Sequence, residues 1–321
     1  MGAALALAER GVGRTAPSPS VGCIIVANGR VVGRGWTQPG GRPHAEAVAL
    51  AHAGSAARGA TAYVTLEPCA HVSARGPDCT GTLVEAGIAR VVVAVEDPDP
   101  RTAGQGIARL RVAGIEVMTG SGEAAARAVM AGFFARQWRD RPFVTLKLAL
   151  SIDGCIALAS GESRWITGPV ARAHAHLERS RHDLIVVGRG TLEADDPALD
   201  VRLEGLADRA PRAAVLSRSL DAIPAGRRLS EALLLHEFSD IDALPDVSSV
   251  LVEGGAGVAA SLLAADRVDR LLVYRAPLLL GGQPGVAALD LGDLASTHGR
   301  WRRSATLPLG VDLLEVYDRT R

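Results

Sequence analysis

Apolar runs rich in β-branched residues recur through the first 141 residues. Four of them predict strands, at 21–26, 30–36, 61–66 and 90–95. Helix-like stretches separate them, after Pro43, after Cys79 and near 104–113. This alternation is typical of a layered α/β domain with a largely parallel sheet. A long helical stretch at 122–137 follows.

A charged cluster and Pro142 predict a domain boundary, because they interrupt the periodic pattern. Six further apolar runs predict a second set of strands, at 143–150, 183–188, 212–217, 232–237, 248–255 and 270–282. Helix-like segments lie near 169–179 and 256–264. We therefore expect two α/β domains, covering residues 1–141 and 142–321.

Composition points to a protein that acts on small molecules. The 321 residues are 48% hydrophobic but only 3% aromatic, so the cores must consist mainly of aliphatic side chains. Lys+Arg 35 balances Asp+Glu 35. Proteins that bind nucleic acids usually carry a basic stripe or patch, so we expect a small-molecule partner and no nucleic acid.

Targeting signals are not evident in the sequence. No apolar run has the length of a membrane span, and the start "MGAALALAER" lacks the basic region and cleavage signal of a secretory peptide. We therefore expect a cytoplasmic protein without a membrane partner. In a reducing compartment, its four cysteines are free thiols or metal ligands.

His44, Cys69 and Cys79 form a candidate metal site. His44 stands just after Pro43 at a helix start, Cys69 follows Pro68 at the end of a strand, and Cys79 comes after a short loop. One imidazole and two thiolates suit zinc, and three protein ligands leave the fourth position to water, as in catalytic zinc sites. Zinc lowers the pKa of bound water from about 15.7 to about 7.

Glu46 is the candidate proton shuttle. It lies two residues after His44, in the first turn, where its longer side chain can bend toward the metal. A carboxylate beside zinc can take a proton from water and return it to a leaving group. Singly, a capping histidine and two buried cysteines are common structural features. H-x-E with a later P-C and a further cysteine is instead typical of zinc deaminases.

The chain resembles the family of bifunctional riboflavin-biosynthesis deaminase/reductases (RibD). "PHAEAVAL" and "TAYVTLEPCAH" match the deaminase half, and "KLALSIDGCIALASGESRWITGP", "LEADDPALDVR" and "VEGGAGVAASLL" match the reductase half. The resemblance implies a cytidine-deaminase-like N-terminal domain and a dihydrofolate-reductase-like C-terminal domain. It also implies one Zn²⁺ per chain, NADPH, and a homo-oligomer formed through the reductase domain.

Two consecutive reactions follow from the resemblance. The first deaminates 2,5-diamino-6-(5-phosphoribosylamino)pyrimidin-4(3H)-one. The second uses NADPH to reduce the ribosyl chain of 5-amino-6-(5-phosphoribosylamino)uracil to ribityl. The substrate is thus a small phosphoribosylaminopyrimidine.

In two places the sequence departs from the family. The loop between the cysteines usually reads "SHHGRTPPC" but here reads "AHVSARGPDC", one residue longer, with Arg75 as the candidate for its basic residue. Near the N-terminus, "SPSVG" replaces the usual "NPxVG", so Ser18 stands where an asparagine touches the substrate. A hydroxyl offers less than the two-sided edge of an amide.

For the reductase half, the residues alone say less. The glycine-rich turn in "SVLVEGGAGVAASLL" suits a phosphate but is common, and "TLEADDPALDVR" also fits a solvated acidic loop. The resemblance assigns NADPH contacts to Ala149, Trp165, Thr191, Asp195, Ser217, Gly255, Ala256, Gly257, Val258, Ala259, Ala260 and Ser261. It assigns substrate contacts to Ser163, Arg179, Leu199, Arg202 and Glu253.

Two other interpretations stay open. One is a nucleobase or tRNA deaminase fused to an unrelated domain, although the low aromatic content and balanced charge do not favour a nucleic-acid platform. The other is a RibD-like protein whose deaminase half is weakened, as Ser18 and the longer loop suggest.

Overall fold

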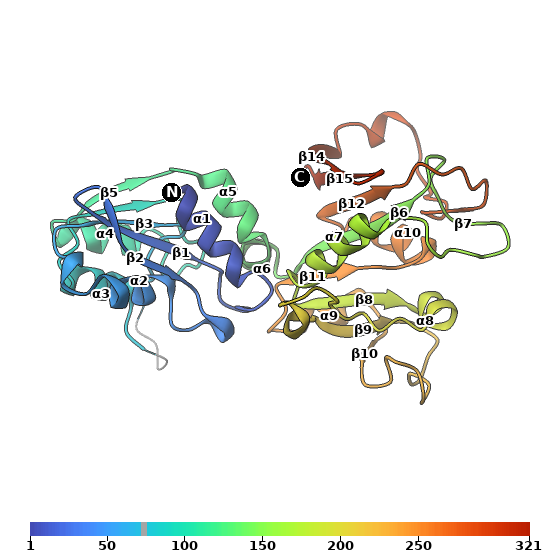
Figure 1. Cartoon of the computed structure of the whole chain (residues 1–321), viewed down its shortest axis with the longest axis horizontal. Helices are drawn as coiled ribbons and strands as arrows, with labels where there is room; N and C mark the ends of the chain where they lie inside the picture. Colours follow the sequence, from blue (N-terminus) through green and yellow to red (C-terminus); the bar gives the residue numbers. More distant parts are fainter. Residues whose placement is uncertain (72–75) are drawn as a thin grey trace. The chain divides into compact units, whose positions relative to one another are not determined.

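A computed structural model describes residues 1–71 and 76–321 of the chain. The backbone divides into two units, Met1–Arg141 and Pro142–Arg321, drawn in Figure 1. Within the described residues, no helix is long and apolar enough to cross a membrane.

The described part of unit 1 contains a sheet in the order β2-β1-β3-β4-β5. Its strands are β1 (Gly22–Ala27), β2 (Arg30–Trp36), β3 (Thr61–Val64), β4 (Arg90–Val93) and β5 (Glu116–Thr119). β3, β4 and β5 are parallel, but β1 runs antiparallel to both β2 and β3. The prediction of a largely parallel sheet therefore holds for β3, β4 and β5 and is wrong for β1 and β2. Asn28 and Gly29, both with positive φ, turn β1 back into β2 as a hairpin.

The helices of unit 1 are α1 (Gly2–Ala8), α2 (Ala45–Ala53), α3 (Cys79–Glu85), α4 (Gln105–Val112), α5 (Glu123–Val129) and α6 (Ala131–Arg139). The helical stretch expected at 122–137 is thus two helices, separated at Met130, whose φ of −102° and ψ of 24° are not helical. Short 3-10 helices occur at Glu9–Gly11, Pro39–Gly41 and Gly54–Ala57, and in unit 2 at Ala207–Arg209 and Ala295–Thr297.

Small residues let helices lie directly on the unit 1 sheet. A Cβ at Gly33 or Gly35 of β2 would come within 2.2 or 2.1 Å of carbonyl oxygens of α2. A Cβ at Gly22 of β1 would come within 1.9 Å of the Ala4 carbonyl of α1. Figure 1 shows α1 on one face of the sheet and α2 with α3 on the other. These contacts fix the start of α2, where His44 and Glu46 lie.

Unit 2 is built on a sheet in the order β10-β9-β8-β11-β6-β12-β15-β14. The strands are β6 (Phe143–Leu150), β8 (Leu184–Gly188), β9 (Arg212–Leu216), β10 (Leu233–Leu235), β11 (Ser249–Val252), β12 (Arg270–Arg275), β14 (Trp301–Leu309) and β15 (Asp312–Arg319). The strands from β10 to β12 are parallel, and β15 and β14 add an antiparallel hairpin that the sequence pattern did not predict. A separate pair joins β7 (Cys155–Ala157) and β13 (Gln283–Pro284).

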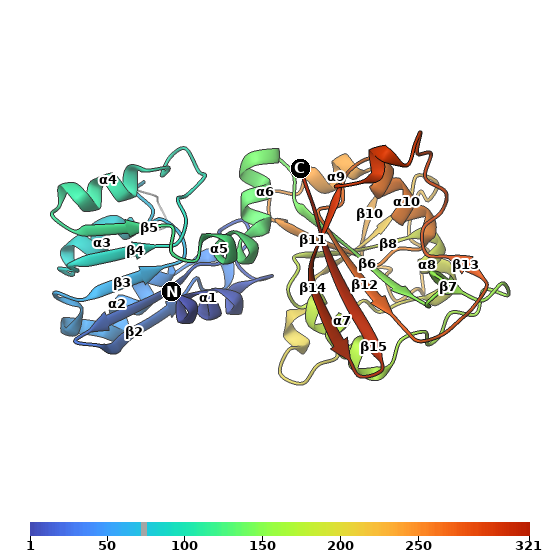
Figure 2. The same cartoon turned by 90° about the horizontal axis from the view of Figure 1, so that it is seen from above.

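The helices of unit 2 are α7 (Pro169–Arg179), α8 (Arg189–Asp195), α9 (Phe238–Asp242) and α10 (Ala256–Ala264). The helices expected at 169–179 and 256–264 are confirmed, and they lie on opposite faces of the sheet (Figures 1 and 2). The acidic segment from Thr191 is not simply a loop, because its first five residues complete α8.

Candidate zinc site and reductase site

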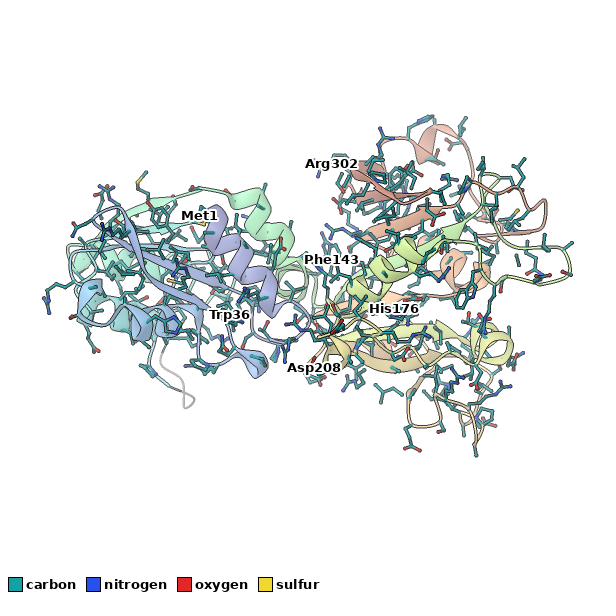
Figure 3. All side chains as sticks on the ribbon, in the orientation of Figure 1. Met1, Trp36, Phe143, His176, Asp208 and Arg302 are labelled. Atoms are coloured by element: carbon teal, nitrogen blue, oxygen red, sulfur yellow. The ribbon has the colours of Figure 1, made fainter. Side chains whose placement is uncertain are left out.

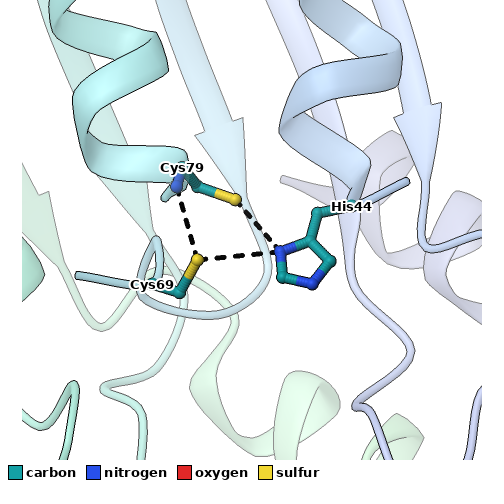
Figure 4. A group of neighbouring side chains, drawn as sticks. All are labelled: His44, Cys69 and Cys79. Carbon is teal, nitrogen blue, oxygen red and sulfur yellow. Dashed lines mark hydrogen bonds between the residues drawn. The ribbon is translucent and has the colours of Figure 1, made fainter. Parts of the chain in front are cut away.

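Three side chains from separate segments of unit 1 converge on one point. The Nδ1 atom of His44 lies 3.2 Å from the sulfur of Cys79 and 3.7 Å from the sulfur of Cys69, as Figure 4 shows. The ligand atoms of the three residues all lie within 4.8 Å of one another. Among residues 1–71 and 76–321, this is the group of His, Cys, Asp or Glu side chains that fits a metal ion.

The spacing of these atoms fits zinc. With bonds of about 2.3 Å to sulfur and 2.0–2.1 Å to nitrogen, tetrahedral zinc places neighbouring ligand atoms roughly 3.5–3.8 Å apart. The two observed distances from His44, 3.2 and 3.7 Å, match this range with little adjustment. Within the described residues the group has three members, so a zinc ion held by them would keep one position for solvent or substrate.

Helix starts hold two of the three ligands in place. His44 is the residue that precedes α2, and Cys79 is the first residue of α3. The backbone amide of Cys79 donates a hydrogen bond of 3.3 Å to the Cys69 sulfur. α4 approaches the Cys69 segment closely, because a Cβ at Gly106 would lie 2.2 Å from the carbonyl oxygen of Pro68.

The surroundings favour a thiolate at Cys69. Hydrogen bonds from Cys79 and His44 outweigh burial and lower the pKa of Cys69 to about 4, whereas the pKa of Cys79 is raised well above its ordinary value by its bond to Cys69. Glu46 is 3% exposed. Burial, and then the charge of Cys69, raise the pKa of Glu46 to about 6. Glu46 is thus a buried carboxylate beside the ligands, with raised affinity for a proton.

Glu67 is a positioning residue that the sequence analysis missed. It is buried, and its carboxylate accepts hydrogen bonds from the amides of Asp97, Gly104 and Ile107, at 3.2, 3.0 and 3.0 Å. It lies two residues before Cys69 and therefore fastens that segment to the loop after β4 and to the start of α4. The motif "LEPC" contained the signal, since a carboxylate within an apolar run needs partners.

Ser18 lies beside the segment that leads to His44. A Cβ at Gly41 would come within 2.3 Å of the Ser18 hydroxyl, so the two residues are in close contact. Arg75, the candidate basic residue of the loop, lies outside the described residues. His71 contacts the Thr102 hydroxyl at 3.2 Å, consistent with a structural role.

In unit 2, Arg179 and Glu253 form a bidentate ion pair. Nε and Nη2 of Arg179 donate hydrogen bonds of 2.7 and 2.9 Å to the two carboxylate oxygens of Glu253. Nζ of Lys147 lies 3.7 Å from the same carboxylate. Burial alone would raise the pKa of Glu253, but the charges of Lys147 and Arg179 bring it to about 2. The structure therefore brings two predicted substrate residues together and places Lys147 beside them.

Lys147 is distinctive already in the sequence. It is the single lysine among the 35 basic residues of the chain. All the other Lys or Arg positions of the chain hold arginine. A lone lysine therefore indicates a place where a compact ammonium group is needed instead of a planar guanidinium. Lys147 and Ala149 lie on the same face of β6, because side chains alternate along a strand.

Arg202, another predicted substrate residue, is connected to Arg179 through Asp200. Nη1 of Arg179 donates a hydrogen bond of 2.9 Å to the carbonyl oxygen of Asp200, and Arg202 forms an ion pair of 3.3 Å with the Asp200 carboxylate. Leu199 is buried, with a positive φ of 54°. His176 of α7, labelled in Figure 3, lies 3.0 Å from the Asp200 carbonyl.

Most of the predicted NADPH residues lie where parallel strands end. Thr191 belongs to α8, which follows β8, and it lies near Gly255, which precedes α10 after β11. The turns touch, because a Cβ at Gly188 would come within 2.5 Å of Val258. Ser217 directly follows β9 and is buried. The carboxyl ends of strands in open α/β sheets are the usual place for ligands.

Ser163 and Trp165 lie on the segment before α7. Arg164, between them, forms an ion pair of 3.0 Å with Asp195, which connects this segment to the end of α8. Trp165 is 64% exposed, and the Arg172 guanidinium lies 4.8 Å from its ring centroid. The structure thus brings Asp195 and Trp165 into one neighbourhood, while the NADPH contacts themselves stay predictions.

Comparison with protein families assigns both units. Residues 1–95 match the cytidine and deoxycytidylate deaminase zinc-binding region, and residues 142–313 match the RibD C-terminal domain. The match of the second unit contradicts the interpretation of a deaminase fused to an unrelated domain.

Several relatives named as RibD match nearly the whole chain. Riboflavin biosynthesis protein RibD of Haemophilus influenzae is 39% identical over 98% of this chain and 95% of the relative, and RibD of Mycobacterium tuberculosis (strain H37Rv) is 41% identical over 98% and 95%. The structure of Acinetobacter baumannii RibD matches with a TM-score of 0.90 and 35% identity over 99% of this chain and 97% of that chain.

A further structure, from Thermotoga maritima, is described as a diaminohydroxyphosphoribosylaminopyrimidine deaminase/5-amino-6-(5-phosphoribosylamino)uracil reductase. It matches with a TM-score of 0.89 and 30% identity over 100% of this chain and 97% of that chain. The expected α/β architecture and the expected bifunctional deaminase and reductase are therefore confirmed. The chain belongs to the RibD family of bifunctional riboflavin-biosynthesis enzymes.

Proposed function

We propose that residues 1–141 deaminate 2,5-diamino-6-(5-phosphoribosylamino)pyrimidin-4(3H)-one and that residues 142–321 then reduce 5-amino-6-(5-phosphoribosylamino)uracil with NADPH. The observation that carries the first step is the convergence of His44, Cys69 and Cys79 beside Glu46. The second step rests on the family and on the charged group around Glu253.

In the deaminase unit, His44, Cys69 and Cys79 would hold one Zn²⁺. Zinc, when bound, supplies an activated water molecule at neutral pH. Glu46 lies close enough to Cys79 that each shifts the pKa of the other, so its carboxylate is next to the ligands. A carboxylate with a raised pKa can accept a proton and donate it to the departing amine, a contribution of roughly 10²–10⁴-fold in rate.

In the reductase unit, the charged group positions the substrate. Arg179 and Arg202 offer planar, forked donors that suit a phosphate or ribose oxygens. Glu253 stays ionised because Lys147 and Arg179 lower its pKa, so it can accept hydrogen bonds from hydroxyl or amine groups. NADPH supplies the hydride, and the protein supplies orientation and electrostatics.

The partner is the small-molecule pyrimidine, and we further propose a homo-oligomer formed through unit 2 and a cytoplasmic location. These proposals derive from the family. Ser18 and the longer loop support one variant of the function, in which deamination is slow relative to reduction.

One experiment tests the function as a whole. The purified chain is analysed for zinc and then given the diaminopyrimidine substrate with or without NADPH. We expect about one zinc ion per chain, in line with a three-ligand catalytic site. We also expect ammonia release without NADPH, and NADPH oxidation only once deaminated product is present. Zinc-loaded protein that releases no ammonia would contradict the first step, and supplied deaminated product that leaves NADPH unoxidised would contradict the second.

A further inference from the structure

Arg109, on α4, contacts both ends of the loop that separates the two cysteine ligands. Its Nη1 atom donates a hydrogen bond of 2.6 Å to the carbonyl oxygen of Ala70, the residue after Cys69. The same nitrogen lies 3.2 Å from Oδ1 of Asp78, the residue before Cys79. One nitrogen atom of α4 therefore joins the two positions that flank the sulfur ligands.

Asp78 transmits this restraint to the start of α3. Its carboxylate accepts a hydrogen bond of 2.7 Å from the amide of Gly81, so Asp78 is the N-cap of the helix. Cys79 is the first residue of the same helix, and its backbone therefore follows the position of the cap. The Asp78 side chain is 12% exposed, and its Oδ1 atom serves both the Gly81 amide and Arg109.

On the other side of the loop, α4 holds the segment that contains Cys69 at three successive points. Backbone amides at the start of α4 donate hydrogen bonds to the Glu67 carboxylate. Gly106 leaves room for the carbonyl group of Pro68, which a Cβ at this position would approach to 2.2 Å. Arg109 then binds the carbonyl group that follows Cys69. Of these contacts, the one made by Arg109 also reaches the segment of Cys79.

The two sulfur atoms drawn in Figure 4 must keep a fixed separation to hold zinc. Bonds of about 2.3 Å in tetrahedral geometry place them roughly 3.8 Å apart. Thr80 provides one link between their segments, because its amide and hydroxyl donate hydrogen bonds of 3.2 and 3.0 Å to the Cys69 carbonyl oxygen. Arg109 provides a second link from a separate helix, at the base of the loop.

The exposure of Arg109 separates a local role from a role in folding. The Arg109 side chain is 48% exposed. Ion pairs at the surface contribute little to global stability, so we expect a chain without this guanidinium to fold. Groups that orient metal ligands nevertheless affect metal affinity, because the ligands must otherwise be brought to their positions when the metal binds.

We infer that Arg109 is a positioning residue of the zinc site. By joining Ala70 and Asp78, it keeps Cys69 and Cys79 at the spacing that zinc requires and so strengthens zinc binding. The inference rests on the proposed zinc site of unit 1. Arg109 acts through the residues beside the ligands and not through the ligand atoms themselves.

The test measures Zn²⁺ binding by the full-length chain, without substrate, in competition with a chromophoric chelator. Arg109→Met removes the charged nitrogen but keeps a long side chain on α4. We expect the dissociation constant for Zn²⁺ to rise about 10-fold, the lower end of the range of roughly 10-fold to 100-fold typical of outer-shell partners, because Arg109 is half exposed. Arg109→Lys retains one cationic nitrogen and should recover part of the lost affinity.

Two further variants make the test specific. Arg111→Met is the matched control, because Arg111 is exposed on the same helix, and it should bind Zn²⁺ as tightly as wild type. Asp78→Asn keeps a good N-cap residue but removes the charge that faces Arg109, so it should also weaken Zn²⁺ binding. Because the two residues act as a pair, Asp78→Asn/Arg109→Met should weaken binding by less than the product of the two single effects.

The outcomes distinguish the inference from the proposed function. Equal Zn²⁺ dissociation constants for wild type, Arg109→Met and Asp78→Asn would overturn the inference and leave the zinc site in place. A rise for Arg111→Met as large as that for Arg109→Met would also overturn it, because any charge lost from α4 would then have the same effect. A wild-type chain that binds no Zn²⁺ would overturn both the inference and the proposed deaminase.

Discussion

The Nδ1 atom of His44 lies 3.2 Å from the sulfur of Cys79, although 35 positions separate the two residues in the chain. The contact arises because His44 precedes α2, Cys79 begins α3, and these two helices touch. Cys69 completes the group from the segment after β3. A metal bound there would also tie three segments of unit 1 together.

Replacement of Cys79 by serine should remove both the metal and the hydrolytic activity. A neutral hydroxyl replaces a thiolate, so we expect the zinc content to fall from about one ion per chain to near zero and ammonia release to stop. Elemental analysis after dialysis and an ammonia assay measure the two effects. Cys155→Ser, a change to a buried thiol of unit 2, is the control and should keep its zinc. A Cys79→Ser protein that retains a full complement of zinc would contradict this ligand assignment.

The Arg179–Glu253 pair should contribute strongly to the stability of unit 2. The Arg179 and Glu253 side chains are 13% and 10% exposed, so Arg179→Ala leaves a buried carboxylate with Lys147 as its nearest cation. The breaking of a buried pair costs about 3–5 kcal/mol, and we expect the free energy of unfolding at pH 7 to fall by that amount. Urea titration measures it. The double variant Arg179→Met/Glu253→Gln should recover part of the lost stability. An Arg179→Ala protein as stable as wild type would contradict the predicted contribution of the ion pair to stability.

Stability should also depend on pH through Glu253. Its pKa in the folded chain, about 2, lies below the ordinary value of 4.5, so the ionised form stabilises the fold above pH 4.5. That stabilisation is lost as the pH falls from 4.5 toward 2. The difference in unfolding free energy between wild type and Glu253→Gln should therefore shrink between pH 7 and pH 3. A difference that stays constant over this range would show that Glu253 is not held ionised by its neighbours.

Ser18→Asn tests whether the deaminase half is weakened. The amide restores the two-sided edge found in the family, and one added hydrogen bond of about 0.5–1.5 kcal/mol corresponds to roughly a 2-fold to 10-fold rise in deaminase kcat/KM. Ser18→Ala should lower the same constant, and neither change should affect reduction of supplied product. Equal values of deaminase kcat/KM for wild type, Ser18→Asn and Ser18→Ala would show that Ser18 does not contact the substrate.

Local patterns predicted the elements that carry strong periodicity. The helices at 169–179 and 256–264 were found with their observed ends, and the spacing of His44, Cys69 and Cys79 indicated the metal group. The motif by itself indicated a zinc deaminase, and the family resemblance supplied what the patterns could not, namely the substrates and the reduction step. The pattern of H-x-E and two later cysteines is informative because few structures other than a catalytic zinc site require these residues at this spacing.

Non-local features escaped the sequence analysis for physical reasons. β14 is an edge strand whose residues are mostly exposed, so it shows little alternation of apolar and polar side chains. The break between α5 and α6 falls at Met130, which is neither a proline nor a glycine, so this residue type does not signal it. Lys147 joins Arg179 and Glu253 only through the pairing of β6 with β11, which no short segment encodes.

The central claim is that Glu46 moves the proton at a zinc site made by His44, Cys69 and Cys79. The most direct test is the rate of ammonia release by Glu46→Gln, with its zinc content measured in the same preparation. We predict full zinc, ammonia release slowed by at least about 100-fold, as expected for loss of a general acid–base group, and unchanged reduction of supplied deaminated product. A zinc-loaded Glu46→Gln protein that releases ammonia at the wild-type rate would contradict the account.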